Sequence, residues 1–116
     1  MAPEAEVEQF LRDFFVKYGI FNILFTERTN PKNAQTLLQL EISPAKRRTI
    51  IESITVKDYV DGPITDQLYG ISSLWVFGKA HGGKEIYIKI SLGHPSSSVL
   101  CISFHVASHK LKYPKT

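Results

Sequence analysis

Residues 84–92 and 100–106 alternate between apolar and polar side chains with a period of two. This period predicts two β-strands, each with one face in the core and one face turned away from it. The core faces are expected to hold Ile86, Ile88, Ile90, Leu92, Leu100, Ile102, Phe104 and Val106. The opposite face then carries Tyr87, Lys89, Cys101, Ser103 and His105. An antiparallel pairing that keeps the core rows opposed puts Tyr87 beside His105 and Lys89 beside Ser103, because a slip of one residue would turn each core row outward.

A helical period precedes these strands near the N-terminus. Apolar residues recur from Val7 to Tyr18 at the spacing of one helix face, and Gly19 offers a left-handed stop, so we expect a helix over about residues 5–18. Residues 20–25 form a short apolar run, which predicts a buried first strand.

Two short helices are expected next. The leucines within residues 33–40 predict the first, and Ser43 followed by Pro44 predicts the cap and first turn of a second helix that runs to about residue 53. The early turns of this second helix carry Lys46, Arg47 and Arg48. Cations are unfavourable near the positive end of a helix dipole, so these side chains are either a solvated helix face or a contact for an anion.

The glycines and proline within residues 57–73 show no sustained period, which predicts a long irregular connection. Residues 74–79 resume as a strand, and His81-Gly82-Gly83 predicts a tight turn into the strand that follows. A turn with an even number of residues would place Trp75 and Phe77 in the core, whereas an odd number would place them on the polar face. We expect the core.

The expected elements follow the order α-β-α-α-β-β-β, which indicates an α+β fold with a small antiparallel sheet flanked by helices. With 116 residues and 43% hydrophobic content, residues 1–116 are predicted to form a single domain. No apolar run is long enough for a membrane span, and the acidic start of the chain is unlike a secretory signal. A net charge of +3 and a single cysteine, Cys101, fit a cytoplasmic protein that meets any anionic partner through a local patch.

The polar face of the two C-terminal strands carries the best candidate chemistry. His105 can act as a general acid or base, Tyr87 can donate a proton or a hydrogen bond, and Lys89 can stabilise negative charge. These are the groups that cleavage of RNA by its own 2′-hydroxyl requires. Phosphate contacts are expected from Lys79, Arg47, Arg48 and Ser103. The plain alternative is a half-exposed histidine on a solvated sheet face, beside an ordinary tyrosine and lysine.

Other histidines and glycines give weaker signals. His81, His94 and His109 lie at turns or near the C-terminal tail, and their spacing matches no compact metal motif. Gly82-Gly83-Lys84 lacks the strand, loop and helix context of a phosphate-binding loop. We therefore expect no metal and no other cofactor.

Four segments in the second half of the chain carry a resemblance to a known family. They are Lys57-Asp58-Tyr59, Leu74-Trp75-Val76-Phe77, Glu85-Ile86-Tyr87-Ile88-Lys89-Ile90 and Val99-Leu100-Cys101-Ile102-Ser103-Phe104. Over roughly residues 55–106 the chain resembles the C-terminal half of the MqsR-type toxins, which belong to the broad RelE-like group of bacterial RNA-cleaving toxins. The resemblance implies a small α+β ribonuclease toxin that cuts messenger RNA without a metal and that an antitoxin encoded beside it holds inactive.

The resemblance also assigns one role and marks three departures. Tyr87 matches a functional tyrosine of the family. The family's lysine after Ser-Phe is His105 here, the glutamine after the tryptophan is Val76, and the lysine expected near Asp61-Gly62 is absent. We therefore predict an endoribonuclease toxin of a toxin–antitoxin system, with RNA and a cognate antitoxin as partners and no membrane. The alternative is a non-catalytic module that binds RNA or protein through the same face.

Overall fold

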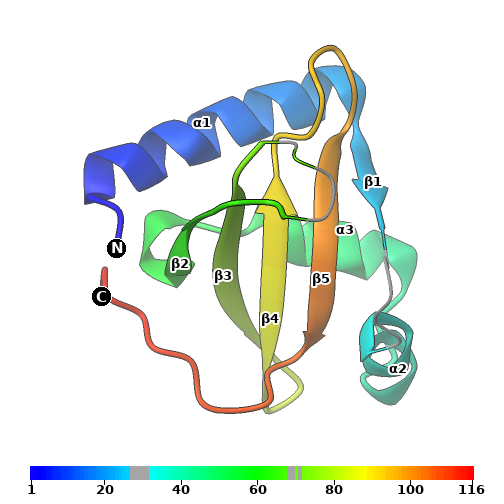
Figure 1. Ribbon diagram of the computed structural model, residues 1–116. Coiled ribbons are helices and arrows are strands. Elements are labelled where there is room, and N and C mark those ends of the chain that lie inside the picture. The colour runs from blue at the N-terminus through cyan, green and yellow to red at the C-terminus, as the bar shows by residue number, and fades with distance from the viewer. Residues whose placement is uncertain (27–31, 68–69, 71) are drawn as a thin grey trace.

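The computed structural model describes residues 1–26, 32–67, 70 and 72–116. Within these residues the chain forms an α+β fold with a mixed five-stranded sheet and three α-helices (Figure 1). The helices are α1 (Glu4–Phe21), α2 (Lys32–Gln39) and α3 (Pro44–Glu52), and a 3₁₀ turn, η1, spans Val56–Asp58. The strands are β1 (Ile23–Phe25), β2 (Tyr59–Ile64), β3 (Leu74–His81), β4 (Lys84–Ser91) and β5 (Val99–Val106). No helix in the described part of the chain is long and apolar enough to cross a membrane.

The sheet has the strand order β1-β5-β4-β3-β2. The pairs β2–β3, β3–β4 and β4–β5 are antiparallel, as predicted for β3, β4 and β5, but β1 pairs parallel with β5. The prediction of a purely antiparallel sheet is therefore wrong at this edge. No hairpin turn joins β1 to β5, so no local sequence signal sets the direction in which they pair.

Strand β2 was expected to be part of an irregular connection. The backbone of Tyr59 pairs with Phe77 and that of Ile64 with Leu74, with two register shifts between them. The second shift, between Asp61 and Ile64, spans Gly62 and Pro63, which are the residues that make the segment resemble a loop in the sequence. An edge strand tolerates proline because its outer N–H groups need no partner strand.

Helix α1 extends further than its pattern predicts. It passes through Gly19 and ends at Phe21, and Asn22 takes the positive φ of 68° at the stop. Ile20, expected in the first strand, therefore lies in the helix with 68% of its surface exposed. The other helices match the predictions closely, and the Ser43 side chain caps α3 by accepting a hydrogen bond from the Lys46 N–H at 3.1 Å.

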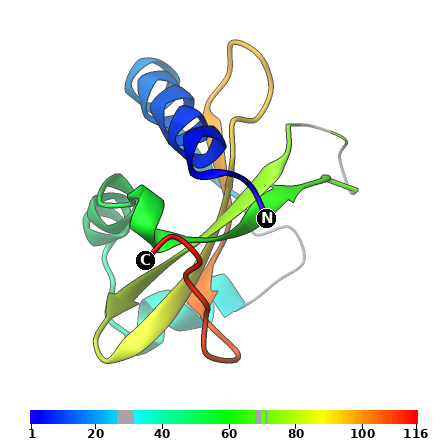
Figure 2. The same ribbon diagram turned by 90° about the vertical axis from the view of Figure 1, so that its left-hand side faces the viewer.

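The core lies between the sheet and the two helices α1 and α3, which cover the same side of it (Figure 2). The turn between β3 and β4 contains two residues, Gly82 and Gly83, both with positive φ. This even number places Trp75 opposite Ile90 and Phe77 opposite Ile88, so both aromatic side chains are in the core as expected.

Helix α2 closes the part of the β5 edge that β1 does not reach. The Asn33 side chain donates to the Ile102 carbonyl at 3.2 Å and accepts from the Phe104 N–H at 3.0 Å. The Thr36 hydroxyl accepts from the Val106 N–H at 2.9 Å. Asn33 is only 4% exposed, so it replaces a partner strand by pairing backbone groups that would otherwise be buried without partners.

After β5, the C-terminal segment passes β4 and reaches the β3 side of the sheet (Figure 1). The Leu111 N–H donates to one oxygen of Glu85 at 2.9 Å, and the Tyr113 hydroxyl donates to the other at 2.7 Å. Leu111 and Tyr113 pack over Gly78, where an added Cβ would lie 2.7 Å from Leu111 Cδ1 and 2.5 Å from Tyr113 Oη. Gly78 therefore leaves the space that this segment fills.

Candidate functional site

The predicted register between the two C-terminal strands is confirmed. Tyr87 pairs with His105, and Lys89 pairs with Ser103. Residues paired directly across strands share a sheet face, so these four side chains lie together on the face opposite the core. The alternating pattern predicted that these side chains share a face, because a slip of one residue would turn the buried isoleucines of β4 outward.

A bulge in β5 changes the rest of the predicted faces. Ile102 is an extra residue, since Ser103 pairs with Lys89 but Cys101 already pairs with Ile90. Beyond the bulge, Val99 and Cys101 join the core in place of Leu100 and Ile102. The prediction that Cys101 lies on the polar face is therefore wrong. Its thiol is 1% exposed, and burial raises its pKa to about 12, so it is a packed core side chain.

The ring of His105 lies against the ring of Tyr87. The centroids are 5.2 Å apart and the planes differ by 14°, which is a stacked arrangement. His105 Nδ1 lies 3.0 Å from the carbonyl oxygen of Val106. A carbonyl can only accept, so Nδ1 carries the hydrogen of this bond and Nε2 is the basic nitrogen of the neutral ring.

His105 is much more buried than the plain alternative expects. Only 9% of its surface is exposed, whereas Tyr87 and Lys89 are partly exposed. The stack and the bond to Val106 together fix the orientation of the imidazole. A general base needs such a fixed orientation, because a small displacement of the reacting atom reduces the rate.

The ammonium group of Lys89 lies 5.8 Å from the centre of the Tyr87 ring. Burial raises the pKa of the Tyr87 phenol, and the negative charge of Asp61 raises it further. The phenol therefore keeps its proton at neutral pH and can donate it. The face thus combines one imidazole, one protonated phenol and one cation.

Asp61 is the residue of this face that the sequence did not reveal. It pairs with Val76, which pairs with Lys89, which pairs with Ser103, so the four positions form one row across β2, β3, β4 and β5. The carboxylate is exposed and accepts a hydrogen bond from the Gly62 N–H at 2.8 Å. The signal was lost because β2 itself was not recognised as a strand.

The expected phosphate-binding cations are not gathered at this face. Lys79 pairs with Ile86, a core position, and its ammonium forms a salt bridge of 3.1 Å with Asp58. The structure therefore separates Lys79 from the Tyr87 and His105 side chains by the thickness of the sheet.

The two arginines of α3 belong to the helix side of the sheet. The guanidinium of Arg47 lies 3.5 Å from the centre of the Phe25 ring, and Arg48 donates to the Asn22 side chain at 2.6 Å. Both contacts attach α3 to the segment around β1. Of the four predicted phosphate contacts, only Ser103 lies beside Tyr87, Lys89 and His105.

Glu85 shares the face of Tyr87, but both oxygens of its carboxylate already accept hydrogen bonds. Its hydrogen bonds from the Leu111 N–H and then the Tyr113 hydroxyl lower its pKa, so the carboxylate stays charged and holds the C-terminal segment beside the site. Within the described residues, no three histidine, cysteine or acidic side chains gather closely enough to hold a metal ion. The chemistry that these side chains can offer is proton transfer and cationic stabilisation.

Comparisons with known proteins give no further guide. No family model, no curated protein and no solved structure matches this chain. The similarity to the MqsR-type toxins stays a prediction from the sequence, and the chemistry of this face must be argued from its geometry.

Proposed function

We propose that this protein is an endoribonuclease that cleaves RNA through the RNA's own 2′-hydroxyl, without a metal ion. One observation carries the proposal, namely the stack of an oriented His105 on a protonated Tyr87, with Lys89 beside it. Acid, base and cation are the three functions that this reaction needs.

In the proposed reaction, Nε2 of His105 removes the proton from the 2′-hydroxyl. The 2′-oxygen then forms a bond to phosphorus while the bond from phosphorus to the 5′-oxygen breaks. Tyr87 gives its proton to the departing 5′-oxygen, and Lys89 stabilises the negative charge that develops on the phosphoryl oxygens. The products are a 2′,3′-cyclic phosphate and a 5′-hydroxyl.

Tyr87 is assigned as the acid because its phenol holds a proton at neutral pH. A phenol whose pKa lies above its ordinary value of about 10 is protonated throughout the neutral range. His105 is assigned as the base because its stack on Tyr87 and its bond to the Val106 carbonyl fix the ring with Nε2 as the basic nitrogen, whereas Glu85 is held by the C-terminal segment.

We further propose that the enzyme is a toxin of a RelE-like toxin–antitoxin system. The support is the similarity of residues 55–106 to the MqsR-type toxins, together with the small α+β fold. RNA is then the substrate in the cytoplasm, and the partner is an antitoxin encoded beside the gene. A neighbouring short reading frame with a DNA-binding motif would support this assignment.

The test compares His105→Ala with His94→Ala, which removes an exposed imidazole outside the site. We expect His105→Ala to reduce RNA cleavage by about 10²- to 10⁴-fold while RNA affinity changes by no more than a few-fold, because a general base contributes to rate and little to binding. Expressed in cells without a partner, the wild type and His94→Ala should arrest growth, and His105→Ala should not. Equal cleavage by both variants would exclude His105 as the base.

A second candidate function is a non-catalytic module that binds RNA or protein. The low exposure of His105 favours it, since the attacking 2′-hydroxyl must reach Nε2 for cleavage, whereas binding needs only the more exposed Tyr87 and Lys89. This module would bind RNA without cleaving it, and wild-type expression would leave growth and RNA unchanged. Lys89→Ala would then weaken binding, and His105→Ala would have little effect.

A further inference from the structure

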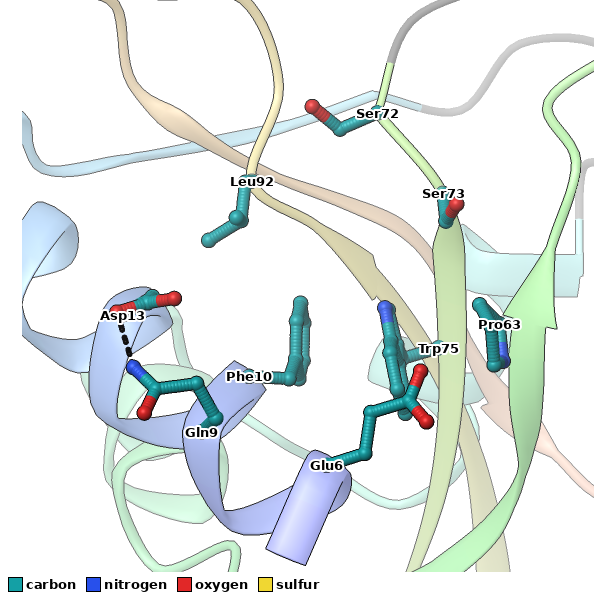
Figure 3. A pocket seen from close by; sticks show the side chains of 9 residues that line it. All are labelled: Glu6, Gln9, Phe10, Asp13, Pro63, Ser72, Ser73, Trp75 and Leu92. Carbon is teal, nitrogen blue, oxygen red and sulfur yellow. Dashed lines mark hydrogen bonds between the residues drawn. The ribbon is translucent and has the colours of Figure 1, made fainter. Parts of the chain in front are cut away.

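A cavity of about 330 Å³ lies on the other side of the sheet, between α1 and the ends of β2 and β3 (Figure 3). Its lining comes from Glu6, Gln9, Phe10, Asp13, Pro63, Ser72, Ser73, Trp75 and Leu92. Trp75 pairs with Ile90 in the core row, so this cavity is separate from the face that carries His105. Its size is in the range of small-ligand sites.

The floor of the cavity is aromatic. The rings of Phe10 and Trp75 are stacked with their centres 4.7 Å apart and their planes 14° apart. Trp75 is 6% exposed, and no other described residue forms a hydrogen bond with its Nε1–H. Figure 3 shows this nitrogen at the end of the ring that faces the space between Leu92 and Ser73. This donor has no partner among the described residues and opens into the cavity, so a ligand that brings an acceptor would complete it.

The rim of the cavity is acidic. Glu6 and Asp13 both lie on the exposed face of α1, and neither forms an ion pair within the described part of the chain. Glu6 and Trp75 both line the cavity, Glu6 from α1 and Trp75 from β3 (Figure 3). Asp13 is oriented by the Gln9 amide, which donates to it at 2.9 Å, and Gln9 is held in turn by Arg12 at 2.9 Å.

We propose that this cavity binds an arginine side chain of a peptide. A guanidinium is planar, stacks on aromatic rings and donates to carboxylates, so it matches the floor and the rim together. The carbonyl of the same peptide residue supplies the acceptor for Trp75 Nε1. The two carboxylates would repel RNA, so the protein binds a cation on this side and a polyanion on the other.

The single tryptophan of the chain provides a direct readout. The probe is N-acetyl-arginine-amide, with the citrulline analogue as an uncharged control of the same shape. We expect the arginine probe to change Trp75 fluorescence with saturation at about millimolar concentration and to shift the one indole N–H signal in the nitrogen-correlated NMR spectrum. The citrulline probe should bind at least about tenfold more weakly, and added salt should weaken the arginine probe.

Two variants locate the interaction on the rim. Glu6→Gln and Asp13→Asn should each weaken the arginine probe by about threefold to fivefold, as expected for a partly exposed ion pair. Glu4→Gln is the matched control, because it removes an exposed charge from the same first turn of α1 but does not line the cavity. All three residues are exposed, so the folded state should be retained, which circular dichroism would verify.

Methylguanidine separates a peptide from a free small cation. It carries the same charge without a carbonyl, so we expect it to bind several-fold more weakly than the arginine probe. Equal binding would reject the peptide in favour of a free guanidine. The proposal as a whole is overturned if the arginine probe leaves Trp75 fluorescence and the indole signal unchanged at tens of millimolar, or if the citrulline analogue binds equally well.

Discussion

At the scale of single residues, Gly78 and Gly19 respond in opposite ways to the same added methyl group. Gly78 sits beneath the C-terminal segment, and a Cβ there would come within 3 Å of Tyr113 and Leu111. Gly19 lies in an exposed turn of α1 with nothing within 4 Å of its Cβ position. One glycine leaves room for packing, and the other only weakens a helix.

We therefore expect Gly78→Ala to destabilise the protein by about 1–3 kcal/mol through overpacking and to loosen residues 107–116. Gly19→Ala should stabilise it by about 0.5–1 kcal/mol, because alanine loses less backbone freedom in a helix. Urea unfolding measures both changes, and limited proteolysis of the C-terminal segment checks the loosening. A Gly78→Ala protein as stable as the wild type would show that the segment does not pack on this strand.

Three tyrosines among the described residues contribute to a loss of stability at alkaline pH. Burial raises the pKa values of Tyr18, Tyr87 and Tyr113, and the hydrogen bond to Glu85 raises that of Tyr113 further. Because the folded values lie above the unfolded value of about 10, the stability linked to these groups is fully present below pH 10 and is lost as pH rises through the folded values.

The free energy of unfolding should therefore fall above about pH 10, and Tyr113→Phe should make that fall shallower. Denaturant unfolding of both proteins at a series of pH values up to 11 measures the slopes. Identical slopes for the two proteins would mean that folding does not raise the pKa of the Tyr113 phenol.

At the scale of elements, the Asn33 side chain acts as a substitute strand for β5. Asn33→Ala would leave the Ile102 carbonyl and the Phe104 N–H without partners, which we expect to destabilise the protein by about 2–4 kcal/mol. Gln35→Ala, on the exposed side of the same helix, should change stability by no more than about 0.5 kcal/mol. Hydrogen exchange at the Phe104 amide provides a local measurement, and unchanged protection there would contradict this role.

The sequence predicted the elements that have a strong periodic pattern. The pairing of Tyr87 with His105 was predictable because the isoleucines of β4 are buried on one side only. The two-residue turn after β3 and the Ser43 cap of α3 were predictable from local residue preferences.

The remaining features depend on contacts between distant residues. The bulge at Ile102 has no signature of its own, since an apolar residue fits either face, and it moved Cys101 into the core. Strand β2 carries Gly62 and Pro63, which usually mark loops, so Asp61 was missed as a member of the site. Arg47 and Arg48 are on the side of the sheet away from His105, which no pattern along α3 could indicate.

At the scale of the whole molecule, the proposed ribonuclease mechanism predicts that cleavage needs a 2′-hydroxyl and needs no metal ion. Cleavage should continue in excess EDTA, since His105, Tyr87 and Lys89 supply the proton transfers and the positive charge. RNA with 2′-deoxyribose at the cleaved position should resist, because the attacking oxygen is missing. Cleavage of that substrate, or inhibition by EDTA that Mg²⁺ or Mn²⁺ reverses, would reject the mechanism even for a true nuclease.

The contacts that β1 and α2 make with the last strand also affect the rate of folding. Ile23 to Phe25 and the side chains of Asn33 and Thr36 find their partners only between Val99 and Val106. Contacts so distant along the chain slow folding, because a long loop must close before they form. During synthesis, the first third of the protein must therefore wait beside the ribosome until the final strand has emerged. Nascent chains halted before residue 99 should accordingly be captured by chaperones, whereas chains released after residue 106 should escape them.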